Sequence, residues 1–219
     1  MAKTNEHGRL IAAAAKAALA PLGCVRKGQS RVWYSDQRFW VIAVEFQPSG
    51  WSKGSYLNIH VAWLWKESRG YAYSYRPADF LPFANEKQFA PLISEMAAVA
   101  AREVSSLRKQ FKSFPDICAC IIKSTPRDCW HNYYAAVASG LARDFTTAHE
   151  YFEKLAAWST HGYAWEETLK NDSAALAALV DQPSIFRSTI LSIIEKRRKL
   201  MRLPPDPHCL DELDSITAP

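Results

Sequence analysis

The stretches FWVIAVEFQ (residues 39–47) and YLNIHVAWLWK (residues 56–66) decide the fold of the N-terminal half. Both are rich in aromatic and β-branched residues, which favour strands. Successive side chains of a strand point to opposite faces of a sheet. One face of the predicted sheet is therefore strongly apolar, and we expect helices to cover it. Its side chains come from Trp40, Ile42, Val44, Phe46, Leu57, Ile59, Val61, Trp63 and Trp65.

The opposite face of the same two strands carries four polar side chains, Glu45, Gln47, Asn58 and His60. If the strands are antiparallel neighbours, cross-strand pairing brings these side chains within a few ångströms of one another. They are the best polar cluster on a rigid element and a candidate binding face. The alternatives are an ordinary solvated sheet face and a buried, hydrogen-bonded set.

The segments around the two strands complete an α+β unit. The Ala-rich stretch 5–20 favours a helix, which Pro21 and Gly23 end. We expect a further strand at 30–34, a hairpin turn at 35–38, and a fourth strand at 70–75, where Tyr71, Tyr73 and Tyr75 share a face. Apolar residues at helical spacing predict a long helix over 85–112, whereas the apolar run 117–122 fits a strand or a helix.

The C-terminal half has a helical pattern. Helices are expected at 128–142, 145–157, 162–170, 172–181 and 184–201, with Asp144 as the cap of the second and Asp172 at the start of the fourth. Residues 203–219 hold four prolines and four acids and are expected to be extended or frayed. We therefore predict an α+β fold, in which a small antiparallel sheet with packed helices (1–115) precedes a helical bundle (116–203) and an acidic, Pro-rich tail (204–219).

Three segments of the sheet half carry a family resemblance: residues 22–28 (LGCVRKG), residues 41–49 (VIAVEFQPS) and residues 57–61 (LNIHV). They resemble the bacterial domain-of-unknown-function family 4304, whose pattern is a helix, a basic entry to a sheet, a strand ending in Gln-x-Ser and a strand carrying Asn. The resemblance covers about residues 8–110, and Cys24 stands where the family usually has Phe. It implies an α+β fold and no established activity.

A second, smaller resemblance lies at residues 142–155 (ARDFTTAHEYFEKL). With the preceding helix from Trp130, this segment resembles a tetratricopeptide-like helical hairpin, near 128–157. Only one such unit is visible, and a solenoid needs at least three. We therefore expect an isolated hairpin packed on its neighbours, with Phe152 in the interior.

Five cysteines at uneven spacing argue against a disulfide framework. Cys118, Cys120, Cys129 and His131 are the sharpest metal candidates, but a one-residue gap in the first pair does not fit the common zinc modules. Buried cysteines that act as small hydrophobic residues are the alternative. We expect no metal and no other cofactor. No nucleophile elbow, zinc-protease motif or phosphate-binding glycine loop is present, so we expect no catalytic residues.

Charge and aromatic residues concentrate in the sheet half. Residues 1–110 hold 15 Lys and Arg against 8 Asp and Glu, a net charge of +7, whereas residues 111–219 hold 12 against 14, a net charge of −2. Aromatic side chains beside Arg31, Lys53, Lys66, Arg69 and Arg76 are compatible with a protein-binding surface, with single-stranded nucleic-acid binding or with core packing. The loop 48–55 places Trp51 and Lys53 between two strands, with no periodic reason for burial.

These patterns predict a non-enzymatic protein-interaction module, for which an immunity or antitoxin role is one concrete version. Its expected contact residues are Trp51, Lys53, Glu45, Gln47, Asn58 and His60. Binding of single-stranded nucleic acid through the basic, aromatic half is the alternative, and a small enzyme that uses the polar face is a third. No apolar run reaches the roughly 18 residues of a membrane span, and Lys16 interrupts the apolar segment 11–20. We expect a cytoplasmic protein with no membrane partner.

Overall fold

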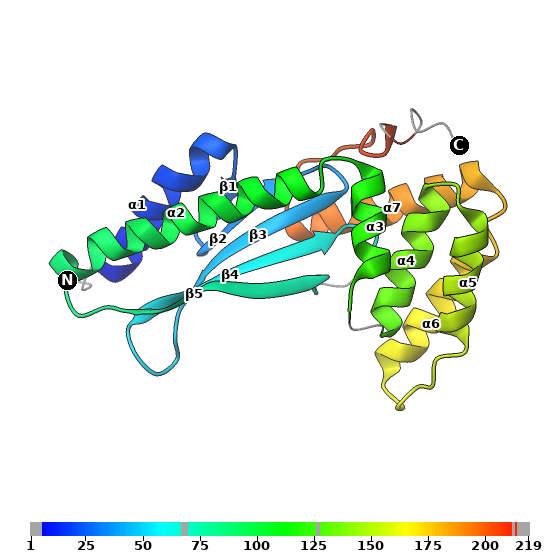
Figure 1. The fold of residues 1–219 in the computed structure, drawn as a ribbon, viewed down its shortest axis with the longest axis horizontal. Helices are drawn as coiled ribbons and strands as arrows, with labels where there is room; N and C mark the ends of the chain where they lie inside the picture. Colours follow the sequence, from blue (N-terminus) through cyan, green and yellow to red (C-terminus); the bar gives the residue numbers. More distant parts are fainter. Residues whose placement is uncertain (1–5, 67–69, 126–127, 212, 214–219) are drawn as a thin grey trace. The chain divides into compact units, whose positions relative to one another are not determined.

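The computed structural model describes residues 6–66, 70–125, 128–211 and 213. Its elements are α1 (Glu6–Leu19), η1 (Ala20–Leu22), β1 (Val25–Arg26), β2 (Val32–Asp36), β3 (Trp40–Gln47), β4 (Gly54–Trp63), β5 (Tyr73–Pro82), α2 (Glu86–Gln110), α3 (Phe114–Lys123), α4 (Cys129–Leu141), α5 (Phe145–Ala156), α6 (Ala164–Ala177) and α7 (Pro183–Met201) (Figure 1). The fold is α+β, with an antiparallel sheet and its helices followed by a helical region.

The described residues form two compact units. We call residues 6–63 and 70–110 the sheet unit, and residues 64–66 and 111–213 the helical unit. Of the helices that the structure describes, none combines the length and the apolar composition needed to cross a membrane.

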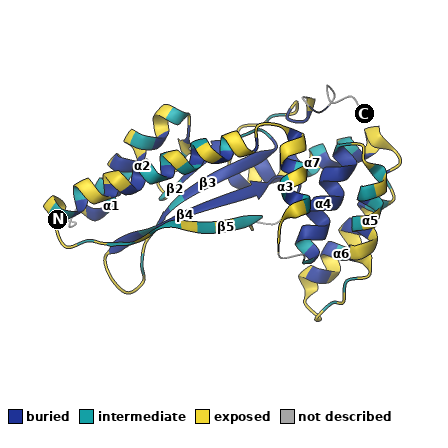
Figure 2. Ribbon diagram, in the orientation of Figure 1, coloured by how far each residue is buried: buried dark blue, intermediate teal, exposed yellow. Residues whose placement is uncertain are grey.

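The sheet is an antiparallel meander with the strand order β1-β2-β3-β4-β5. Strand β4 pairs with β3 so that Asn58 lies opposite Glu45 and His60 lies opposite Ala43. These two central strands are the most buried of the sheet (Figure 2). The expected antiparallel sheet is therefore confirmed, and the register of β3 and β4 places the four polar side chains on one face.

Helices α1 and α2 lie on the other, apolar face of the sheet (Figure 1). Helix α2 buries seven side chains at helical spacing, from Phe89 to Leu107, and side-chain hydrogen bonds also connect it to the sheet. Tyr75 donates a hydrogen bond to Glu103 over 2.7 Å, and Arg108 donates to the hydroxyl of Ser35 over 2.7 Å. The expectation that helices cover the apolar face is confirmed.

Helix α4 is the core of the helical unit. Apart from Trp130, all its residues are buried, and it packs against α3, α5 and α7. Gly140 permits a close approach to α7, because a Cβ at this position would lie 2.8 Å from ring carbons of Phe186. Phe152 of α5 is 4% exposed, so its predicted interior position is confirmed.

Most of the expected helices form, and one ambiguity is resolved. The carboxylate of Asp144 accepts a hydrogen bond from the backbone N–H of Thr147 and caps α5 as predicted. The run 117–122 lies in a helix, α3, whose first turn is fixed by a capping box between Ser113 and Asp116.

Other expectations about element boundaries are wrong. Residues 162–170 and 172–181 do not form two helices, because α6 runs through Asp172 without a break. Strand β2 continues to Asp36, so the turn follows it, and a short strand, β1, precedes it. The strand expected at 70–75 begins at Tyr73 and continues to Pro82.

The strand expected over 56–66 ends at Trp63. The residues that follow belong to the helical unit, where the Trp65 ring lies 6.3 Å from that of Phe114. Trp65 is therefore not part of the apolar sheet face.

The C-terminal segment is not extended or frayed throughout. Cys209 and Leu210 are at most 1% exposed and Leu213 is 6% exposed, so apolar side chains anchor this segment through residue 213. The rest of the expected tail, residues 214–219, lies outside the described residues.

Candidate functional site

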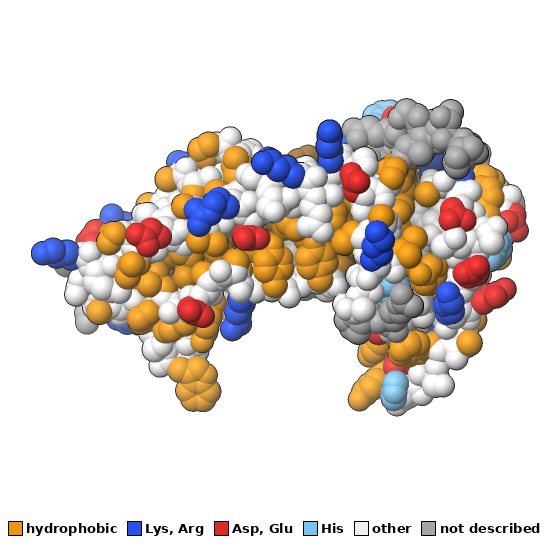
Figure 3. All heavy atoms as spheres, viewed as in Figure 1, with side chains coloured by type: hydrophobic (Ala, Val, Ile, Leu, Met, Phe, Trp, Pro, Cys, Tyr) orange, Lys and Arg blue, Asp and Glu red, His pale blue; other side chains and the backbone are white. Residues whose placement is uncertain are grey.

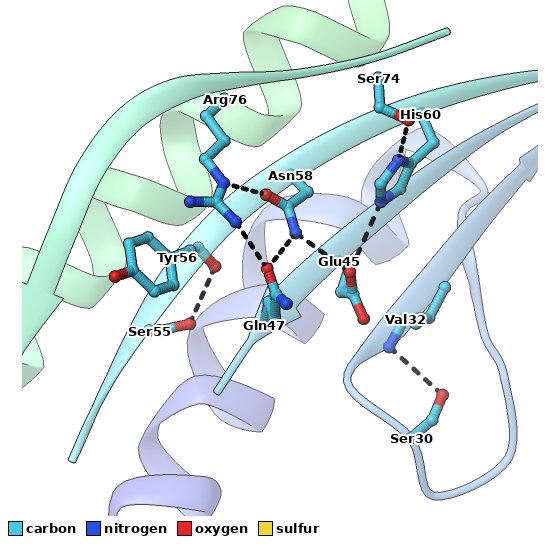
Figure 4. A network of polar contacts seen from close by, with 10 residues as sticks. All are labelled: Ser30, Val32, Glu45, Gln47, Ser55, Tyr56, Asn58, His60, Ser74 and Arg76. Carbon is cyan, nitrogen blue, oxygen red and sulfur yellow. Dashed lines mark hydrogen bonds and ion pairs between the residues drawn. The ribbon is translucent and has the colours of Figure 1, made fainter. Parts of the chain in front are cut away.

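A hydrogen-bonded polar network crosses strands β3, β4 and β5 (Figure 4). At its centre is Asn58, which is 7% exposed. The Asn58 amide donates to Glu45 over 3.1 Å and to Gln47 over 2.8 Å, and its oxygen accepts from the Arg76 guanidinium over 2.9 Å. Since buried polar atoms need hydrogen-bond partners, these three contacts explain how the sheet accommodates a buried amide.

His60 extends the network toward the other end of β4. Its Nδ1 lies 2.6 Å from the Ser74 hydroxyl, and its Nε2 lies 3.5 Å from the Glu45 carboxylate. Its ring stacks on Tyr71 with a centroid distance of 4.1 Å. The hydrogen bond from His60, together with that from Asn58, lowers the pKa of Glu45 despite partial burial, so Glu45 is ionised at neutral pH.

Arg76 is the member of this network that the sequence analysis did not place. Its guanidinium donates to Gln47 over 3.0 Å as well as to Asn58, and it lies 4.3 Å from the centroid of the Tyr56 ring. Alternation in β5 gives the sequence indication, since Ser74 and Arg76 alternate with Tyr73 and Tyr75. The expectation that Tyr71 shares the face of these two tyrosines is wrong, because Tyr71 precedes β5 and its ring stacks on His60. Arg76 and Ser74 are exposed, whereas Asn58 and His60 are buried.

Glu45, Gln47, Asn58 and Arg76 form one connected set of hydrogen bonds. Its charges are a carboxylate and a guanidinium, and the amides of Gln47 and Asn58 connect them. Such an arrangement fixes side-chain positions and couples three strands.

Trp51 and Lys53 lie on the loop between β3 and β4. The Trp51 side chain is 99% exposed. The loop backbone is nevertheless held in place, because the Ser49 hydroxyl accepts from the N–H of Trp51 over 3.1 Å and the Lys53 carbonyl accepts from the N–H of Phe83 over 3.0 Å. The structure thus presents a large apolar side chain to solvent on a locally ordered loop.

A cavity of about 750 Å³ adjoins this loop. Trp51, Lys53, Arg31 and His7 line it, together with Glu6 and Phe83. Burial lowers the pKa of His7, and the nearby Arg31 lowers it further, so His7 is neutral at pH 7. The two cations Arg31 and Lys53 therefore outweigh the single carboxylate of Glu6 at this cavity.

The cysteines do not form a metal centre in the described residues, which contain no group of three or more His, Cys, Asp and Glu side chains that could hold an ion. Cys118 and Cys120 lie on helix α3 rather than on a strand, so they do not share a face. The Cys118 thiol lies 3.7 Å from the Ala138 carbonyl, and the His131 ring lies 3.2 Å from the Ser124 hydroxyl.

Several basic side chains of the sheet unit are engaged in internal contacts. Arg26 donates to two backbone carbonyls, Arg108 donates to Ser35 and to the Leu22 carbonyl, and Arg76 belongs to the polar network. On the face drawn in Figure 3, Lys and Arg side chains lie apart from one another among neutral and apolar ones. Arg69, another basic candidate, lies outside the described residues.

Comparison of the chain with protein-family models, with curated proteins and with solved structures finds no match. The family resemblances of residues 8–110 and 128–157 therefore remain predictions.

Proposed function

We propose that the protein is a non-enzymatic protein-interaction module that contacts its partner through the β3–β4 loop. The observation that carries this proposal is the Trp51 side chain, which is 99% exposed on an ordered loop. Tryptophan is enriched among the residues that contribute most to binding at protein interfaces. Association would remove this large apolar side chain from water.

The charges around the loop indicate the chemistry of the partner. Lys53 and Arg31 line the cavity beside Trp51, and the sheet half has a net charge of +7. We therefore propose a partner with an apolar pocket for Trp51 and acidic side chains around it. A toxin neutralised by an immunity or antitoxin protein is one partner of this kind.

The polar network has a supporting role in this proposal. Gln47 ends β3 directly before the loop, and the Arg76 guanidinium fixes it to β5. Asn58 and His60 are buried, so they contribute by positioning Glu45, Gln47 and Arg76 rather than by large contacts of their own.

Nucleic-acid binding is the less favoured alternative. Phosphate recognition needs basic side chains that are available to the ligand, whereas Arg26, Arg76 and Arg108 form internal hydrogen bonds. Binding of an oligonucleotide that weakens steeply with salt concentration would support this alternative.

The test is a quantitative pulldown from native lysate with wild type, Trp51→Ala and Val25→Ala, followed by affinity measurement with the captured protein. Val25 is the control, because it is also an exposed apolar residue of the sheet unit, at 68%. We expect Trp51→Ala to weaken binding by more than about 1 kcal/mol with an unchanged melting temperature, and Val25→Ala to bind as wild type does. Equal recovery of every partner by all three proteins would refute the proposal.

A further inference from the structure

The helical unit contains a second cavity, with a volume of about 620 Å³. This lies within the range of about 300–1,000 Å³ that is typical of small-molecule sites. Its walls are mainly apolar and aromatic, and they include Trp130, Trp165, Leu169, Leu176 and Ile193. Lys66 also lines it. All these residues belong to one unit, so the cavity is independent of the surface proposed above.

Lys66 is an unusual residue to find in such a wall. It is only 9% exposed, and its Nζ lies 3.3 Å from the centroid of the Trp130 ring and 5.8 Å from that of Tyr134. In the part of the chain that the structure describes, no carboxylate lies within ion-pair distance of this ammonium group. A buried cation without a counter-ion is unfavourable, and an anionic ligand would relieve that cost.

The other charged side chains at the cavity do not change the sign of its net charge. Asp172 and Lys196 also line it, and each has an interaction of its own. Since their charges are opposite, Lys66 determines the sign of the net charge at the cavity. Burial and the nearby Arg197 lower the pKa of Lys66 to about 8, so the ammonium form still predominates at pH 7.

Aromatic rings extend from Lys66 to the molecular surface. Trp130 stacks on Trp165 with centroids 5.7 Å apart and an interplanar angle of 14°, and Trp165 stacks on Tyr163 with centroids 6.4 Å apart. Trp165 is 45% exposed and Tyr163 is 60% exposed. These stacked rings give the cavity an aromatic wall at its rim, and such a wall favours an apolar ligand that packs against it.

We propose that this cavity binds a small aromatic carboxylate, with its anionic group beside Lys66 and its ring against Trp165 and the apolar wall. The ammonium group supplies up to three N–H donors for a carboxylate. The leucine and isoleucine side chains exclude water from the body of the ligand. Lys66 thus recognises the anionic group of the ligand, and Trp165 with the apolar wall recognises its ring.

The experiment is a calorimetric titration with 2-naphthoate and with its neutral counterpart, 2-naphthamide. We expect wild-type protein to bind 2-naphthoate at least tenfold more tightly than 2-naphthamide. In Lys66→Met this preference should fall below twofold. Lys199→Met is the matched control, because Lys199 is an exposed lysine of α7, and it should retain the preference.

Trp165→Ala provides an independent test of the aromatic wall, since a partly exposed side chain in the first turn of α6 can be removed without loss of the fold. It should weaken both probes by at least fivefold while leaving the preference for the anion in place. Failure of wild type to bind 2-naphthoate, equal binding of the two probes, or an anion preference that persists in Lys66→Met would overturn the proposal. None of these results bears on the proposed Trp51 surface, which the pulldown and the affinity measurement with a protein partner test separately.

Discussion

Arg76 and Lys66 both lie over an aromatic ring, but their surroundings differ. Arg76 is exposed and has two side-chain acceptors, Gln47 and Asn58. Lys66 is buried, and its contacts are with the faces of Trp130 and Tyr134. The first arrangement stabilises a cation within a hydrogen-bonded network, whereas the second leaves a desolvated ammonium that ring quadrupoles and the nearby charge of Asp128 stabilise without an ion-pair contact.

The burial of Lys66 predicts a characteristic dependence of stability on pH. Its pKa is about 8 in the folded protein and about 10.5 when exposed. Between these values the unfolded chain binds more protons, so the contribution of Lys66 to stability rises with pH. The free energy of unfolding of wild type, relative to that of Lys66→Met, should therefore increase by about 2 kcal/mol from pH 7 to pH 9.5.

Urea denaturation of both proteins at the two pH values measures this difference. The subtraction removes contributions from groups that titrate in both proteins, and Lys199→Met, which changes an exposed lysine, should parallel wild type. If the difference in free energy of unfolding between wild type and Lys66→Met changes by less than about 0.5 kcal/mol from pH 7 to pH 9.5, the ammonium is not desolvated.

At the scale of elements, the polar network adds side-chain hydrogen bonds to the backbone pairing of β3, β4 and β5. Arg76 projects from β5, which is an edge strand and pairs with β4 through irregular register at Leu57. Side-chain contacts from Arg76 to β3 and β4 therefore reinforce the part of the sheet where backbone pairing is interrupted.

We predict that Arg76→Ala lowers the free energy of unfolding by about 1–2 kcal/mol, because the buried oxygen of Asn58 loses its donor. Arg102→Ala is the control, since Arg102 is an exposed arginine of α2, and it should change stability by less than about 0.5 kcal/mol. Chemical denaturation of the three proteins provides the comparison. Equal stability of wild type and Arg76→Ala would mean that solvent replaces the network at no cost.

At the scale of the whole molecule, the two units differ in charge and in the kind of surface that they present. The sheet unit has an exposed tryptophan and a basic cavity rim, and the helical unit has an apolar cavity with a buried lysine. The two proposed functions, protein contact and small-ligand binding, are thus assigned to different units and can be tested separately.

We also predict that the purified protein carries less than one zinc ion per chain. Burial raises the pKa of the Cys118 thiol to about 12 and also raises that of Cys129, so both thiols stay protonated at neutral pH, and zinc binds thiolates. Elemental analysis should find substoichiometric zinc, and EDTA should leave the melting temperature unchanged. One zinc per chain that is lost in Cys118→Ser would contradict this prediction.

The sequence by itself determined the sheet faces and most of the helices. Alternation along 39–47 and 56–63 separates Glu45 and Asn58 from the apolar side chains, because the period of a strand is a local property. The cap at Asp144 is equally local, since it needs only the first turn of α5. A prediction of the same local kind is wrong at Asp172. Aspartate often starts a helix, but favourable packing continues α6 through this residue.

The tertiary structure alone decided the position of Lys66 and the role of Arg76. In the sequence, Lys66 continues the alternation of a strand, but the strand ends at Trp63 and Lys66 packs on Trp130, 64 residues further along the chain. Arg76 reaches Gln47 only because β5 pairs with β4 and β4 with β3. Such contacts depend on which distant segments bury their apolar surfaces together, and periodicity, which reports only whether a residue is buried, cannot specify its partner.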